Sequence, residues 1–278
     1  MAWMQSTAPT TLKRTRDGHL KPTDLILKQE QELKLLIEPF TTTLCFGLAK
    51  EYLPQQISSA QLSKLFIRKA NIHTNMLIAY RVLTRTFMLA SAIWDRYIQE
   101  VMVVVDTKET TPINMQQFDA LAGASFLIAC KVVETNAPSV FDIKVFFHDR
   151  ARMSTILEAE SHILHVLHFD VSIVTAVDVV DKLCSFAHET VGKQIHPTVQ
   201  NSLEVTCCEQ SFNIYSVADL AMGVILYACL KKNIPDEQLN FIPKFMLTSS
   251  ALQCKQDLCD FITQVMSSIT QKKEKSQG

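Results

Sequence analysis

A short segment of small and apolar residues occurs twice in this chain of 278 residues. The first copy, residues 118–134, reads FDALAGASFLIACKVVE, and the second, residues 220–232, reads LAMGVILYACLKK. Both contain the pattern Ala-x-x-x-x-Leu-x-Ala-Cys. A helix that is apolar on all sides is buried, and small side chains let neighbouring helices approach it closely. The repeat therefore predicts two helical units in tandem, each built around one copy of this segment.

The composition favours helices over sheets in both units. Apolar residues make up 47% of the chain, which is enough for two cores of ordinary domain size. There are only 6 Gly and 9 Pro, whereas a fold with many strands needs many turns. We therefore predict an all-α fold.

The polar and apolar patterns divide the chain into four parts. Residues 1–23 are polar and predict a disordered tail, and residues 271–278 form a charged tail. Residues 24–171 contain the first unit and the helices that precede it, and residues 172–270 contain the second unit. Within these units helices are expected at 86–101, 118–134, 140–147, 154–169, 176–191 and 198–212, and from the N-cap Ser216 onward.

Several classes of function do not fit this sequence. The formal net charge is −1 with both signs mixed along the chain, so we expect no direct contact with nucleic acid. No apolar run is long enough for a transmembrane helix, so no membrane is expected. Phosphate-binding loops and nucleophile motifs are absent from the sequence, which predicts a protein that is not an enzyme and has no cofactor. The 8 Cys are scattered, mostly within apolar patterns, as in a reduced intracellular protein.

Neither the histidines nor the cysteines form a convincing metal site. His162, His165 and His168 are spaced by three, so their rings fan around a helix and one ion cannot easily reach all of them. The adjacent Cys207 and Cys208 match no zinc spacing. No metal is expected.

Three charged residues occupy positions that an ordinary core helix would make apolar. Lys131 and Glu134 lie one turn apart just after the apolar body of the first segment. Glu160 interrupts an apolar stripe between Ile156 and Ile163. These charges either extend to water or bind a partner, and their positions alone leave both interpretations open.

Three longer stretches together resemble the cyclin family. TFMLASAIWDRYIQ, which contains Asp95 and Arg96, is similar to the second helix of the cyclin box. LAGASFLIACKVVETNAPSV, which contains Gly123 and Ala129, is similar to the third helix and its exit loop. ILEAESHILHVLHFDV is similar to the fifth helix. The clear resemblance covers residues 86–171.

The resemblance implies two tandem five-helix cyclin folds and a non-catalytic subunit that binds and activates a cyclin-dependent Ser/Thr kinase as a heterodimer. Lys131 and Glu160 would pair at the centre of the kinase-binding face, with Glu134 nearby. Asp95, Arg96, Gly123 and Ala129 would be structural. The expected role is in the cell cycle, meiosis or transcription, in the nucleus and secondarily in the cytoplasm.

Two other functions remain open for a chain with this resemblance. One is a cyclin-fold scaffold that assembles complexes without activating a kinase. The other is a module of transcription assembly similar to TFIIB, which would normally have a basic surface and a zinc ribbon.

Overall fold

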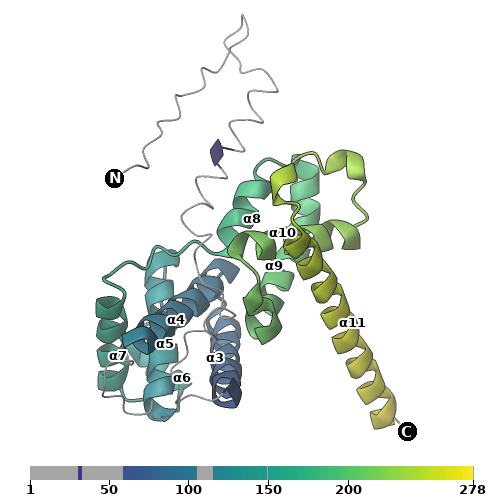
Figure 1. Ribbon diagram of the computed structural model, residues 1–278. Helices are drawn as coiled ribbons and strands as arrows, with labels where there is room; N and C mark the ends of the chain where they lie inside the picture. The colour runs from purple at the N-terminus through teal and green to yellow at the C-terminus, as the bar shows by residue number, and fades with distance from the viewer. Residues whose placement is uncertain (1–30, 33–58, 105–114, 149, 278) are drawn as a thin grey trace, which may run out of the picture.

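A computed structural model describes residues 31–32, 59–104, 115–148 and 150–277 (Figure 1). All regular secondary structure within these ranges is helical, which confirms the all-α prediction. The predicted tail 1–23 and most of the chain from 24 to 58 lie outside the described residues.

The first unit is built around its most apolar helix. It contains α3 (Ser59–Tyr80), α4 (Thr84–Val104), α5 (Met115–Val133), α6 (Val140–Phe146) and α7 (Met153–Val166). Helix α5 contacts all four of the others, and its residues from Phe118 to Cys130 are buried. The predicted central helix is therefore confirmed.

The second unit repeats this arrangement around the second copy of the segment. It contains α8 (Ala176–Cys184), α9 (Glu189–Cys208), α10 (Val217–Lys231) and α11 (Ser249–Gln277), with the short 3-10 helices η2 (Gln210–Ile214), η3 (Asp236–Gln238) and η4 (Lys244–Met246). Helix α10 is central and contacts α8, α9 and α11. Ser216 is its N-cap, as predicted, because its hydroxyl accepts a hydrogen bond from the Asp219 N–H.

The helix boundaries between α8 and α9 differ from the sequence prediction. The expected helices 176–191 and 198–212 are wrong, because α8 ends at Cys184 and α9 runs from Glu189 to Cys208. The imidazole of His188 accepts a hydrogen bond from the Thr190 N–H and so caps α9 early. Pro197 then lies inside α9 on its exposed side, where the helix continues despite the missing N–H.

The two units share a packed seam. Met88 of α4 is 6% exposed and packs into the core of the second unit, and its Sδ accepts a hydrogen bond from Cys207 Sγ at 2.9 Å. Arg85 of α4 binds Asp178 at 2.5 Å and Asp181 at 2.8 Å, both on α8. These contacts join the units across the link from α7 to α8, where we propose the boundary between them.

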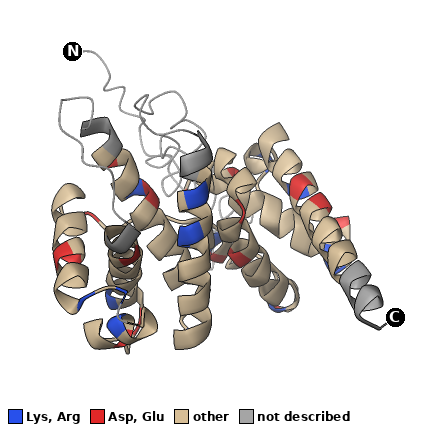
Figure 2. Cartoon of the chain, turned by 90° about the horizontal axis from the view of Figure 1, so that it is seen from below, with Lys and Arg blue, Asp and Glu red and all other residues tan. Residues whose placement is uncertain are grey.

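Helix α11 continues well past the second unit (Figure 1). Leu258 is fully buried, whereas Val265, Met266 and Ile269 are between 39% and 59% exposed. In the described part of the chain, no helix has both the length and the apolar character that spanning a membrane requires. Charged residues of both signs are spread over both units (Figure 2).

Candidate partner-binding site

The centre of the candidate site is an ion pair between α5 and α7. Lys131 is in the last turn of α5, and its Nζ lies 2.5 Å from Oε1 of Glu160 on α7. The Lys131 side chain is 49% exposed, whereas that of Glu160 is 12% exposed. The structure therefore brings these two predicted site residues together and leaves the ammonium group accessible.

The pair lies beside exposed apolar side chains. Met153, Leu157, Glu160 and Leu164 are spaced by four, three and four residues, so they form one stripe along α7. Met153 is 40% exposed and Leu157 is 46% exposed, and Val132 next to Lys131 on α5 is 53% exposed. An exposed apolar surface around a charged centre is typical of an interaction site.

Glu134, one turn after Lys131, has a different contact. Its Oε1 accepts hydrogen bonds from the Leu83 N–H at 2.8 Å and from the Thr86 hydroxyl at 2.5 Å. These donors belong to the start of α4, where backbone N–H groups have no partner within the helix. Glu134 thus ties the C-terminus of α5 to the N-terminus of α4, a role that the sequence analysis did not predict.

Asp95 forms a partly buried ion pair that holds α3 against α4. Nζ of Lys69 lies 2.9 Å from Oδ1 and 3.0 Å from Oδ2 of Asp95, and Lys69 is 1% exposed. Burial raises the pKa of the Asp95 carboxyl, and the Lys69 ammonium group opposes this effect. Lys69 was not among the predicted site residues, although a lysine on the apolar side of α3, beside Phe66 and Ala70, was a signal in the sequence.

The other predicted structural residues are at helix contacts. Arg96 of α4 binds the Asp170 carboxylate at 3.1 Å and so fixes the chain that leaves α7. A Cβ added to Gly123 would lie 2.7 Å from Cε2 of Phe147 and 3.0 Å from Cγ2 of Ile143. Ala129 is fully buried. Each of these residues contributes to the relative placement of the helices that carry Lys131 and Glu160.

The histidines and thiols have structural contacts. His162 Nδ1 lies 2.9 Å from the Tyr97 hydroxyl, and burial raises the pKa of Tyr97 to about 12. Burial likewise raises the pKa of the Cys130 and Cys254 thiols to about 12, as expected of thiols that pack like small hydrophobic groups. Among the described residues, no group of three or more His, Cys, Asp or Glu is placed to hold a metal ion.

Comparison with known proteins agrees with this geometry. Residues 73–172 match the family model of the cyclin N-terminal domain. The first unit thus contains a cyclin N-terminal domain. The match includes α4, α5, α6 and α7, and therefore both Lys131 and Glu160.

Solved structures show that the cyclin fold extends over both units. The viral cyclin from herpesvirus saimiri has a TM-score of 0.64 at 15% identity. The match covers 86% of this chain and 96% of the viral cyclin chain. A chain of the CAK complex from Chaetomium thermophilum bound to ATP-γ-S has a TM-score of 0.51 at 12% identity. The match covers 87% of this chain and 75% of that chain. A search of curated protein sequences gave no significant match.

Proposed function

We propose that this protein is a non-catalytic regulatory subunit that binds and activates a cyclin-dependent protein kinase through the surface around Lys131 and Glu160. The observation that supports this most directly is the half-exposed Lys131–Glu160 pair beside the apolar stripe of α7. The match of this region to the cyclin N-terminal domain is the second support.

The geometry suits recognition of a helix end. A lysine ammonium group has three donors, and Glu160 takes one of them, so Lys131 has donors left for carbonyl oxygens of a partner. The last four carbonyl groups of a helix have no partner within it and are suitable acceptors. Glu160 holds the Lys131 side chain in place, which reduces the entropy lost on binding.

Activation then follows from a shift of conformational population. A protein kinase is active when a helix of its small lobe is positioned to complete a Lys–Glu ion pair and its activation loop is ordered. A subunit that binds this arrangement more tightly than the inactive one stabilises it without taking part in phosphoryl transfer. We propose that this protein acts in that way in the nucleus, in the cell cycle, meiosis or transcription.

The first experiment is affinity capture of the full chain from its native cells, with mass spectrometry of the bound proteins and a kinase assay on the captured complex. Wild type is compared with Lys131→Glu and with Lys193→Glu as a matched control. Lys193 pairs with Glu189 at the same 2.5 Å, on the exposed surface of α9. We expect a cyclin-dependent kinase with wild type and with Lys193→Glu, and its loss with Lys131→Glu.

The loss should be large, because Lys131→Glu leaves two carboxylates facing each other in the interface. Disrupting a desolvated charge pair costs about 2–5 kcal/mol of binding. The double variant Lys131→Glu, Glu160→Lys restores the internal ion pair, so it should fold normally and still fail to bind. Capture of the kinase by these variants at wild-type levels would contradict the proposed surface. Assembly factors without a kinase, in all samples, would favour the scaffold function.

A further inference from the structure

We propose that the seam between the two units holds a binding pocket for a small uncharged ligand, consisting of about one six-membered ring with a carbonyl oxygen attached. The pocket lies away from Lys131 and Glu160, so this inference does not depend on the proposed kinase-binding function.

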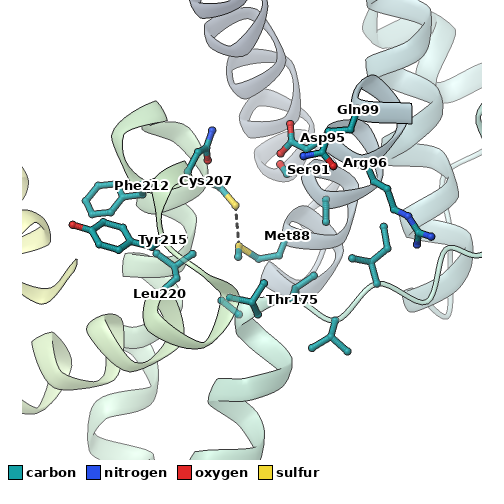
Figure 3. A pocket seen from close by; sticks show the side chains of 16 residues that line it. Met88, Ser91, Asp95, Arg96, Gln99, Thr175, Cys207, Phe212, Tyr215 and Leu220 are labelled. Carbon is teal, nitrogen blue, oxygen red and sulfur yellow. Dashed lines mark hydrogen bonds between the residues drawn. The ribbon is translucent and has the colours of Figure 1, made fainter. Parts of the chain in front are cut away.

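The pocket is formed jointly by both units (Figure 3). One wall is α4 of the first unit, with Met88, Ser91 and Asp95, and the opposite wall is η2 and α10 of the second unit, with Phe212 and Leu220. Its volume is about 150 Å³, and it is partly open to solvent. An apolar cavity of about 150 Å³ is large enough for benzene.

One polar atom in this pocket has no partner. The side chain of Asn213 in η2 lines the pocket, and its Nδ2 is buried without a hydrogen bond to any residue that the structure describes. A buried amide donor left unpaired is unfavourable, and nearly all such groups in proteins are paired. A ligand that places an acceptor oxygen at Nδ2 would satisfy it.

The charge of the pocket restricts the ligand further. Arg96 lines the pocket, but its guanidinium group binds the Asp170 carboxylate at 3.1 Å. Asp95 also lines it, with a side chain that is 27% exposed and accepts both hydrogen bonds from Lys69 at its carboxylate. An anionic ligand would be repelled by this carboxylate at close range. An amide or ketone carbonyl is an uncharged acceptor, and the apolar wall accommodates the ring attached to it. These requirements together define an aromatic or cyclic carbonyl compound.

The test uses acetophenone and ethylbenzene, which have nearly the same shape but differ in the carbonyl oxygen. Binding to the full chain is followed by NMR at the methyl group of Met88, which lines the pocket. We expect both compounds to bind saturably, with acetophenone about threefold to tenfold tighter because it accepts one hydrogen bond. Benzoate, the anionic analogue, should bind no better than ethylbenzene.

Two variants test whether the compounds bind in this pocket. Asn213→Leu removes the donor at nearly constant volume, so it should fold normally and lose the preference for acetophenone. Ala92→Phe should fill the pocket and abolish binding of both compounds, since Ala92 lines it. A circular-dichroism melt checks that each variant is folded.

Three results would overturn the proposal. One is the absence of saturable shifts at Met88 with millimolar acetophenone. Another is an undiminished preference for acetophenone in the folded Asn213→Leu variant. The third is unchanged binding in the folded Ala92→Phe variant, which would place the ligand elsewhere on the molecule.

Discussion

His73 is a histidine in the interior of the first unit that must remain neutral. It is fully buried, and its Nε2–H donates to the Ala122 carbonyl at 3.0 Å while Nδ1 lies 3.4 Å from the Ser91 hydroxyl. Burial is the main reason that its pKa falls from 6.5 to about 3, and the nearby Lys69 ammonium group lowers it further. The imidazole that joins α3, α4 and α5 is therefore uncharged near neutral pH.

This predicts an acid-dependent loss of stability that can be assigned to one residue. Because the folded pKa lies below the unfolded value, the contribution of His73 is complete above pH 6.5 and is lost as the pH falls from 6.5 toward 3. Between pH 7.5 and 5 the free energy of unfolding of wild type should fall about 2 kcal/mol more than that of His73→Gln. Urea titrations at several pH values measure this difference.

Comparing wild type with His73→Gln removes the contribution of the carboxyl groups to the pH dependence, because both proteins contain the same carboxyl groups. His196→Gln is the matched control, because His196 is an exposed histidine on α9. Parallel pH profiles for wild type and His73→Gln would show that His73 does not titrate as its burial requires.

Single residues also show how far the sequence could define the site. Lys131 and Glu160 could be singled out because each is a charge inside an apolar pattern, and the resemblance to cyclins implied their pairing. The capping contact of Glu134 could not be found in this way, since it joins residues that are distant in the chain. Lys69 could have been singled out as a charge on the apolar side of α3, but its pairing with Asp95 on another helix could not.

At Gly123, helix α5 depends on close approach by neighbouring side chains. Phe147 and Ile143, the side chains that a Cβ at Gly123 would meet, are both fully buried and have little room to move. Gly123→Ala should therefore lower the free energy of unfolding by about 1–3 kcal/mol, although alanine favours helices. Denaturant unfolding followed by circular dichroism measures the change.

Gly192 of α9 provides the matched control for this substitution. A Cβ there would come no closer than 3.7 Å to its nearest neighbour, the Cys184 carbonyl oxygen. Gly192→Ala should raise the free energy of unfolding by up to about 1 kcal/mol. Equal effects of the two substitutions would mean that α5 does not need its glycine for packing.

The same contrast explains which helices the sequence could predict. Helices α5 and α10 are buried on all sides, so small and apolar residues mark them almost without interruption. Helix α9 has polar residues on its exposed side and Pro197 in its interior, so its pattern indicated a break where none exists. Its true start depends on a cap by His188, which is not among the residue types that usually cap helices.

At the scale of the whole molecule, Met88 couples the two units, because it belongs to the first unit and packs into the core of the second. Wild type should therefore unfold in a single calorimetric transition, because separating the units would expose Met88 and the surface around it. Met88→Ala should cost about 2–5 kcal/mol and resolve two transitions.

Met153→Ala is the matched control for Met88→Ala, since Met153 is 40% exposed on α7. Its effect should stay within about 0.5 kcal/mol. A single transition that persists in Met88→Ala, with little loss of stability, would mean that other contacts couple the units.

The joined units also fix the direction of α11. From the buried Leu258 to its end at Gln277, this helix rises about 28 Å at 1.5 Å per residue. Met88 and Arg85 hold the second unit against α4, so this seam sets the separation between Lys131 and the apolar side chains of Val265, Met266 and Ile269. A partner bound at the proposed surface around Lys131 would therefore also touch the distal half of α11 only if its reach matches that separation.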